Sequence, residues 1–360
     1  MILKETERLL YCARRARTHA HKNLNIVAKQ KILTLGEREM NQRLPEVKFQ
    51  RYTFLDGSEQ VLVQKVGDGS IIKRFDKTPI PQNPTDVVCP HFLELKWAYG
   101  CPYDCAWCFL KGTLRLLSTR TKPIVKDYCK IQKHLESFFD NDGHSREALN
   151  TGELADSLMT EHTNKPFSRF IIPLFEEQEQ HKVLFLTKST IIKNLMKMKN
   201  HNQVIVSFSL NAPSVARKWE RAPPVEKRLE AAKILSEAGY ETRIRIDPIV
   251  PVENWQKQYL GIIDSIFSKF VPERITLGSL RGLQSTINNA RDKSWTMFMT
   301  ETSNWGKKIA FKTRFLIYET VLEYLRSKYN YPRVALCKET IDMWTKLGMD
   351  YKSIQCNCLP

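Results

Sequence analysis

Hydrophobic and polar positions alternate in short runs through the middle of the chain. The β-rich runs, each bounded by polar turns, are 92–98, 182–186, 204–210, 242–249 and 274–277. Between them lie helical stretches, of which the clearest is 225–238, where apolar residues recur at helical spacing and Gly239 gives a stop signal. This alternation predicts an α/β fold, a parallel sheet or barrel with helices outside, whose active site lies at the carboxyl ends of the strands.

The flanking segments have a different pattern. Residues 1–44 look helical and basic, and the apolar runs 47–49 and 61–63 are separated by Asp56-Gly57, which predicts a hairpin. A polar, proline-rich loop is expected at 76–90, and the chain turns helical again after residue 310. We therefore expect three parts: a basic N-terminal helical and hairpin extension (1–88), an α/β domain (89–285), and a helical C-terminal extension with a cysteine-rich tail (286–360).

The charge of the chain changes the expected partners. Its formal net charge is +17 over 360 residues, which favours binding to polyanions such as DNA or RNA, although a merely basic enzyme remains the alternative. No run of eighteen apolar residues is present, so we expect no membrane span. The first residues lack the apolar segment of a secretory signal, and a cytoplasmic location is expected.

Nine cysteines, an odd number at uneven spacing, indicate metal or redox chemistry rather than a disulfide framework. The densest group is Cys101, Cys105 and Cys108, in the segment LELKWAYGCPYDCAWCFLKGTLR. Three thiolates can ligate three irons of a cubane cluster and leave the fourth iron open. A structural zinc site is the alternative, but such a site usually shows a fourth ligand at regular spacing.

Cys-x-x-x-Cys-x-aromatic-Cys, with Trp107 as the aromatic residue, resembles the signature of the radical S-adenosylmethionine (SAM) superfamily. Later motifs resemble its spore photoproduct lyase branch, often labelled DNA repair photolyase. These motifs are 186–188 (LTK), 206–211 (VSFSLN), 228–232 (RLEAA), 238–240 (AGY) and 247–249 (DPI). The resemblance spans about residues 90–285. It implies a partial (β/α)6 barrel, a [4Fe–4S] cluster, SAM on the open iron, and reductive cleavage to a 5′-deoxyadenosyl radical, with flavodoxin or ferredoxin as a reductant.

The resemblance also implies cofactor-binding residues. Thr151, Gly152 and Glu153 occupy the place of a Gly-Gly-Glu-like motif that binds the SAM amino group. Lys188 resembles a ligand of the SAM carboxylate, and Trp107 would pack on the cluster or the adenine. Ser209 and Asn211, at the end of the next strand, could meet the ribose or carboxylate. The alternatives are a strand-end turn, an exposed lysine, core packing and local capping. Asp247 could touch adenosine or only close a turn.

One departure from the lyase concerns a cysteine. In that branch a cysteine returns a hydrogen atom to the lesion, from the strand that here reads EALNTGELAD and contains none. Cys129, the nearest, lies in the preceding helical stretch. Elsewhere, Cys337, Cys356 and Cys358 have three interpretations: a second metal centre, a dithiol in which Cys356 and Cys358 donate hydrogen atoms or electrons, or incidental thiols on a disordered terminus.

Basic residues after the cysteine loop and after the 204–210 run would lie near the mouth of such a barrel, where Trp219 could stack on a base. The leading hypothesis is therefore a radical SAM enzyme that repairs or modifies DNA or RNA. The alternatives are a radical SAM enzyme acting on a peptide or small molecule with an auxiliary cluster, and a non-catalytic, metal-stabilised nucleic-acid-binding protein.

Overall fold

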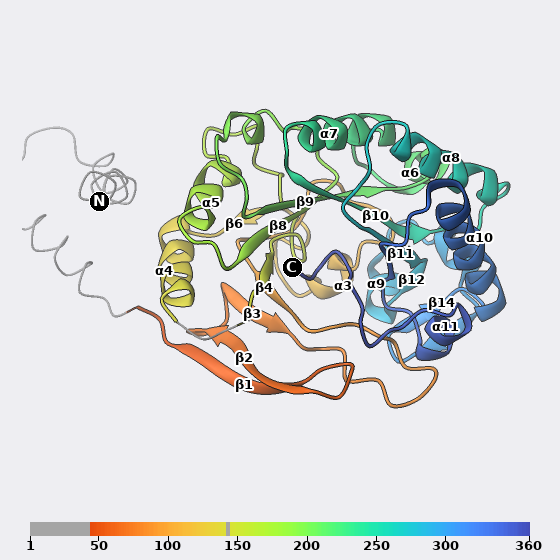
Figure 1. The fold of residues 1–360 in the computed structure, drawn as a ribbon, viewed down its shortest axis with the longest axis horizontal. Coiled ribbons are helices and arrows are strands. Elements are labelled where there is room, and N and C mark those ends of the chain that lie inside the picture. Colours follow the sequence, from red (N-terminus) through yellow and green to blue (C-terminus); the bar gives the residue numbers. More distant parts are fainter. Residues whose placement is uncertain (1–43, 142–144) are drawn as a thin grey trace, which may run out of the picture.

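The computed structural model describes residues 44–141 and 145–360, so the predicted basic helical arm lies almost wholly outside the described residues. The central feature is a ten-stranded sheet with the order β1-β2-β3-β4-β7-β8-β9-β10-β11-β15. Helices surround this curved sheet, and the C-terminus lies in the middle of the molecule (Figure 1).

The antiparallel edge of the sheet is the predicted hairpin with one further strand. It consists of β1 (Val47–Thr53), β2 (Glu59–Val66) and β3 (Ile72–Phe75). β1 pairs antiparallel with β2 around a turn in which Gly57 has φ +87°, a left-handed conformation that glycine adopts without steric cost. β3 then pairs with β4, which joins this edge to the rest of the sheet.

The remaining strands of the sheet run parallel to one another. They are β4 (Phe92–Leu95), β7 (Ala148–Asn150), β8 (Lys182–Thr187), β9 (Val204–Leu210), β10 (Glu241–Ile249), β11 (Ile275–Ser279) and β15 (Val334–Leu336). Every residue of β9 is buried, which explains its continuous apolar run, because a central parallel strand is covered on both faces. The strands expected from sequence are thus confirmed, β7 lies within the stretch EALNTGELAD that the resemblance treats as a strand, and β15, with three residues, was not predicted.

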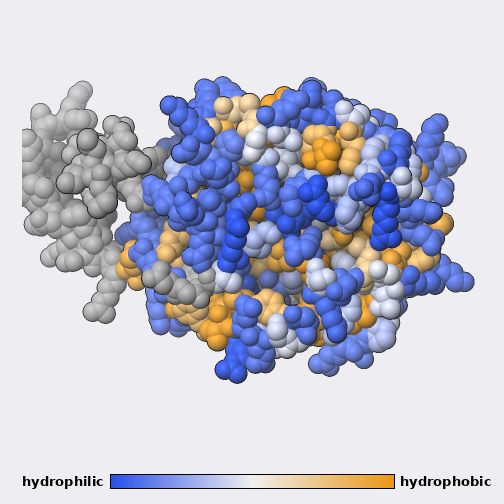
Figure 2. All heavy atoms as spheres, viewed as in Figure 1, coloured by the Kyte–Doolittle hydropathy of each residue, from blue (hydrophilic) through white to orange (hydrophobic). Residues whose placement is uncertain are grey.

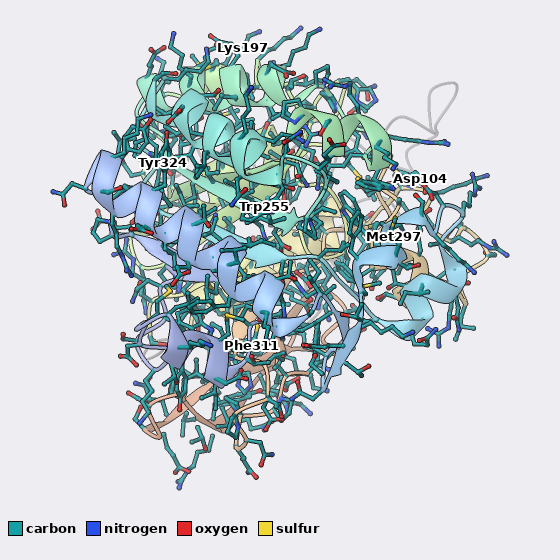
Figure 3. All side chains as sticks on the ribbon, turned by 90° about the vertical axis from the view of Figure 1, so that its right-hand side faces the viewer. Asp104, Lys197, Trp255, Met297, Phe311 and Tyr324 are labelled. Atoms are coloured by element: carbon teal, nitrogen blue, oxygen red, sulfur yellow. The ribbon has the colours of Figure 1, made fainter. Side chains whose placement is uncertain are left out.

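Helices connect the strands and cover the outside of the sheet (Figure 1). The longer ones are α4 (Tyr128–Phe139), α5 (Phe167–Phe175), α6 (Pro213–Trp219), α7 (Val225–Glu237), α8 (Trp255–Phe267) and α10 (Phe311–Tyr329). The helix predicted at 225–238 is confirmed as α7, and Gly239 ends it at φ +87°. α10 packs on α8 and runs along one side of the molecule, where Figure 3 labels Phe311 and Tyr324.

The segment expected to be a helical C-terminal extension also contains strands. Besides β15, it holds β13 (Glu301–Ser303) and β14 (Gly306–Lys308), which form a small sheet with β12 (Arg281–Gly282). The other short elements are β5 (Ala98–Tyr99), β6 (Ile124–Val125), α3 (Leu110–Thr113), α9 (Gln284–Asn289), α11 (Ile341–Lys346), and the 3₁₀ turns Leu195–Lys197 and Ser294–Phe298. Because β1–β3 and β15 share one sheet with the central strands, the predicted boundaries at 88 and 285 separate no independent sheets.

One hydrophobic core runs through the described part of the chain, from β2 to the tail. Its largest fully buried side chains include Trp97, Trp295 and Trp344. In the described residues, no helix has the length and apolar character that a membrane span requires. Figure 2 shows a mainly hydrophilic face with smaller hydrophobic patches between.

Candidate active site

A cavity of about 380 Å³ opens where the parallel strands end. Its lining includes Lys188 after β8, Ser209 near the end of β9, Asp247 in β10 and Cys337 after β15. The cysteines that are free in the described residues all line it: Cys89, Cys101, Cys105, Cys108, Cys337, Cys356 and Cys358. The volume lies in the range of small-molecule sites, so this edge of the sheet is the candidate active site.

Backbone contacts hold the cysteine loop in place. Gly100 has φ +82°, and a side chain there would meet the Lys122 carbonyl oxygen at 2.4 Å, so only glycine fits this turn. The Cys101 N–H donates to the Thr121 carbonyl at 3.0 Å, and the Cys108 N–H donates to the Cys105 carbonyl at 3.1 Å. The loop is therefore preorganised with its three thiols at the cavity.

Charged side chains lie beside these thiols and beside one another. Burial raises the pKa of Cys105 and Cys101, and the Lys188 ammonium opposes this rise at Cys105. Burial also disfavours the charge of Lys188, but the neighbouring Glu220 carboxylate keeps the Lys188 pKa above its usual range. Glu220 lies 4.0 Å from Lys188 and 2.7 Å from the buried Arg228, so Lys188 is held in a fixed ion-pair network beside the loop.

The predicted 151–153 motif follows β7 in a tight turn. The Gly152 N–H donates to the Asn150 side-chain oxygen at 2.9 Å, and a Cβ on Gly152 would lie 2.5 Å from Leu186. Gly152 and Glu153 line the cavity. Thr151 does not, because its hydroxyl is buried and donates to the Leu184 carbonyl at 2.8 Å. The turn thus presents one carboxylate to the cavity, while Thr151 holds the turn to β8.

Of the two polar residues expected at the end of β9, only one faces the cavity. Ser209 lines it, as does Trp107 of the cysteine loop. Asn211 is fully buried, donates to the Pro248 carbonyl at 2.9 Å and accepts from the Tyr259 hydroxyl at 2.7 Å. Because its amide is satisfied inside the protein, the structure brings Asn211 to a capping position, the alternative considered for it, rather than to the cavity.

Several charged residues of the cavity were missed by sequence reasoning. Asp156 is buried and accepts from the Thr187 hydroxyl and the Lys188 N–H, both at 2.7 Å. Arg281 donates two hydrogen bonds of 2.9 Å to the Asp247 carboxylate, and Arg245 donates a third of 3.2 Å. Although burial opposes ionisation, these guanidinium groups hold the Asp247 pKa below its usual range. The alternating pattern of 242–249 could have indicated that Arg245 and Asp247 share a face.

The C-terminal tail is partly buried in the molecule, and its end lies near the centre of the view in Figure 1. Asn357 is 1% exposed, and its amide donates to Ser207 at 2.7 Å and to the Ile244 carbonyl at 2.9 Å. Arg243 and Arg274 donate to backbone carbonyls of the tail. The expectation of a disordered end is therefore wrong, since these contacts fix the tail against β9, β10 and β11, while the role of its thiols stays a prediction.

The tail carries two of its cysteines to the cavity as a pair. Cys356 and Cys358 are hydrogen-bonded to each other, and Cys358 lies 4.0 Å from the Asn150 amide nitrogen and 3.9 Å from Arg245. Cys337 instead accepts from Arg245 at 2.8 Å and from Arg281 at 3.3 Å. In the described residues no group of three or more His, Cys, Asp or Glu is placed to hold a single metal ion. With Arg245 between Cys337 and Cys358, the geometry disfavours a mononuclear centre there.

The residues of the two basic segments near the cavity differ in their exposure to solvent. Arg120 and Lys122 are exposed after the cysteine loop, and Arg217 and Lys218 are exposed at the end of α6. Trp219, in contrast, is 3% exposed, packs 5.7 Å from Trp107 between ring centroids, and donates to Ser294 at 2.8 Å. The prediction that Trp219 stacks on a base is therefore wrong, because its faces are covered by the protein.

The model of the spore photoproduct lyase family matches residues 93–278, which is more than half of the chain. The chain belongs to the spore photoproduct lyase family. Relatives in this family include the spore photoproduct lyase of Clostridium acetobutylicum, 26% identical over 184 residues (49% of this chain and 52% of the relative). That of Bacillus subtilis is 24% identical over 176 residues (48% and 50%). The chain thus spans about half the length of the curated relatives it matches.

Solved structures of spore photoproduct lyase share the fold. One complexed with dinucleoside spore photoproduct superimposes with a TM-score of 0.57 at 16% identity, covering 68% of this chain and 75% of the other. A mutant with bound AdoMet and dinucleoside spore photoproduct gives 0.56 at 16% identity, with 69% and 76% covered. The match to the family model includes the cysteine loop, the Glu153 turn, Lys188 and Asp247.

Proposed function

We propose that this protein is a radical SAM enzyme that binds a [4Fe–4S] cluster on Cys101, Cys105 and Cys108 and SAM in the adjoining cavity. The observation that carries the proposal is that these three thiols line one cavity with Glu153 and Lys188. A [4Fe–4S] cluster with SAM on its open iron supplies reductive cleavage of SAM to methionine and a 5′-deoxyadenosyl radical.

The donor set fits a cubane cluster better than a single ion. Three soft thiolates suit iron–sulfur ligation, and each binds a different iron, so their sulfurs need not converge on one point. This is consistent with the absence, in the described part of the chain, of a group placed to hold one ion. A zinc site would need four donors within about 2.0–2.3 Å of one centre, so a zinc-stabilised, non-catalytic protein is the weaker alternative.

The charges around the cavity suit the amino-acid end of SAM, which carries an ammonium and a carboxylate. Glu153 offers a carboxylate to the ammonium, and Lys188 offers an ammonium to the carboxylate. Ser209 adds a hydroxyl at the end of β9. We assign cofactor binding to these residues and Gly152, with Trp107 packing beside the loop, whereas Thr151 and Asn211 act by supporting the turn and the strand end.

We further propose that the parallel strands form a partial barrel around this cavity and that the substrate is a nucleic acid. The net charge of +17 and the exposed arginines and lysines beside the cysteine loop support a polyanionic partner. The similar solved structures hold a dinucleoside, which supports a base or lesion as the reacting group. A flavodoxin- or ferredoxin-class protein would supply the electron.

Anaerobic reconstitution with iron and sulfide tests this proposal. We expect brown protein with about four irons per chain, together with release of 5′-deoxyadenosine from SAM under a low-potential reductant. Cys101→Ala should lose both. Oligonucleotides bearing ultraviolet lesions should raise the rate in a salt-sensitive manner. Zinc-containing, colourless protein without 5′-deoxyadenosine release would overturn the proposal.

Iron counting also tests the alternative of a peptide or small-molecule enzyme with an auxiliary cluster. That alternative requires about seven to eight irons per chain and iron retained after loss of the Cys101 loop. The arginine contacts of Cys337 argue against it, because a guanidinium occupies the space between Cys337 and Cys358.

A further inference from the structure

We propose that Cys358 returns a hydrogen atom to a carbon radical formed in the cavity, and that Cys356 captures the resulting sulfur radical. This inference rests on the proposed function, because it requires a radical to be generated there. It assigns to the tail a chemical role that goes beyond binding of the cluster and SAM.

The position of Cys358 is the first support. Its sulfur lies 4.0 Å from the amide nitrogen of Asn150, the last residue of β7, and it lines the cavity shared with the cysteine loop. β7 itself reads Ala148-Leu149-Asn150 and offers no thiol. The tail therefore brings an S–H group to the end of β7 from the other end of the sequence.

The anchoring of the tail is the second support. The side chain of Asn357, between the two cysteines, makes three hydrogen bonds to β9, β10 and β11, through Ser207, Ile244 and Thr276. Arg243 and Arg274 bind the carbonyls on both sides of it. Such fixation would hold a donor against the reacting atom, since hydrogen transfer to a radical needs contact between the two centres.

The pairing of the two sulfurs divides their roles. The hydrogen bond from Cys358 favours the thiolate of Cys356 and lowers its pKa. The same bond, with burial, raises the pKa of Cys358 well above its usual range, so Cys358 keeps the S–H that a hydrogen-atom donor requires. Arg245, 3.9 Å from Cys358, opposes this rise in the Cys358 pKa, because its positive charge favours the thiolate.

The other thiols of the cavity have different partners. Cys337 accepts hydrogen bonds from Arg245 and Arg281, and Cys89 lies beside the Lys338 ammonium and the Pro90 carbonyl. The cysteine loop is assigned to the cluster. Among the cavity thiols of the described residues, Cys356 and Cys358 are the pair joined by a thiol–thiol hydrogen bond.

The step balances as follows. The S–H bond of Cys358 breaks, a C–H bond forms on the radical carbon, and Cys358 becomes a thiyl radical. The Cys356 thiolate then bonds to this thiyl sulfur and gives a disulfide radical anion, with no proton moved. An oxidised flavodoxin- or ferredoxin-class protein accepts the odd electron and leaves a disulfide. A dithiol of the thioredoxin class reduces that disulfide and is itself oxidised.

The experiment uses the reconstituted full-length enzyme in D₂O, where thiols become S–D. With SAM and reductant alone, the carbon radical in the cavity is the 5′-deoxyadenosyl radical, so no nucleic-acid substrate is needed. We expect 5′-deoxyadenosine to carry one deuterium in the wild type and none above natural abundance in Cys358→Ser. Serine keeps the shape and the hydrogen bond, but its O–H bond is too strong to donate a hydrogen atom.

A second readout follows the pair itself. Trypsin cleavage after Lys352 releases residues 353–360, which contain Cys356 and Cys358 and no other cysteine. Alkylation should label both thiols before turnover and neither after turnover without a dithiol reductant. Cys89→Ser is the matched control, since it removes another cavity thiol and should leave both readouts unchanged.

The outcomes separate this inference from the function on which it rests. No 5′-deoxyadenosine from wild type overturns the radical SAM function, and with it this inference. Wild-type 5′-deoxyadenosine formation with the same deuterium content in Cys358→Ser overturns the role of Cys358 alone. If added dinucleoside spore photoproduct is turned over, the deuterium from Cys358 should appear in the repaired dinucleotide instead of in 5′-deoxyadenosine. Cys358→Ser should give no such labelling of the dinucleotide.

Discussion

Two regions bring cysteines to the same cavity in opposite ways. The loop with Cys101, Cys105 and Cys108 is contiguous in sequence, and backbone hydrogen bonds hold it within itself, at Cys105, and to Thr121, Leu154 and Trp219. The tail with Cys356 and Cys358 is held by two side chains and a backbone carbonyl that lie 81, 150 and 113 residues earlier in the chain. The short spacing of the loop brings its three cysteines together within one segment, whereas the tail reaches the cavity only through contacts with strands that are distant in sequence.

The two regions also differ in the charged groups that surround their cysteines. Beside the loop lie the ammonium groups of Lys188, which is paired with Glu220, and of Lys111, which is paired with Asp104. The tail is contacted by three guanidinium groups, those of Arg243, Arg245 and Arg274. The metal ligation proposed for the loop and the hydrogen donation proposed for the tail are distinct uses of cysteine, and the following predictions test whether the two regions can be separated.

Replacing Cys101 by alanine should have the largest effect and should be confined to the loop. We expect iron content and 5′-deoxyadenosine release to fall to background, because two thiolates cannot replace three. The two thiols in residues 353–360 should still be alkylated at the wild-type rate. Cys89→Ala serves as the control for removing a cavity thiol. If Cys101→Ala kept its iron, the loop would not be the cluster site.

Lys188→Met should weaken SAM binding without removing the cluster. A hydrogen bond to a charged group contributes about 1.5–3 kcal/mol, so the Kd for SAM should rise about 10- to 100-fold in equilibrium dialysis. Lys193→Met, at an exposed position after the same strand, is the matched control. An unchanged Kd would remove Lys188 from the SAM site.

Asn357→Ala tests how the tail is held. It leaves Ser207, Thr276 and the Ile244 carbonyl without their buried partner, so the free energy of unfolding should fall by about 1–3 kcal/mol. Urea unfolding measures this change, and Cys358 should also become more accessible to alkylation. The exposed Asn202→Ala should change neither quantity. Stability equal to wild type would mean that the tail is not anchored through this side chain.

The pH dependence of alkylation tests the pair more finely. Because the hydrogen bond from Cys358 lowers the pKa of Cys356, the reactive thiolate should be present at lower pH than for a free cysteine. Cys358→Ala removes that donor, so the midpoint of Cys356 alkylation should move to higher pH. The measurement is labelling of residues 353–360 against pH by mass spectrometry. A midpoint that does not move would show that the sulfurs act independently.

The smallest effect is expected at the basic surface. Arg120→Ala removes one exposed charge beside the loop, so the slope of log affinity for single-stranded DNA against log salt should decrease by about 0.7. Lys197→Ala, at the distant end of the molecule labelled in Figure 3, should leave the slope unchanged. Equal effects of the two variants would indicate binding without a defined surface.

The sequence predicted much of the central architecture and part of the site. Periodicity located β8, β9, β10 and α7, and the cysteine spacing located the loop. It did not reveal β15, because three residues are too few to show a period. The prediction that Trp219 stacks on a base was wrong, because the sequence does not show whether an aromatic side chain near the cavity is covered by other residues. The domain boundaries, the cytoplasmic location and the reductant stay predictions.

Sequence alone determined that three cysteines would share one turn, because their spacing is short enough for local backbone geometry to fix it. Only the tertiary structure decided that Cys356 and Cys358 reach the same cavity. The position of the tail depends on hydrogen bonds to three neighbouring strands, and no local pattern records which strands become neighbours.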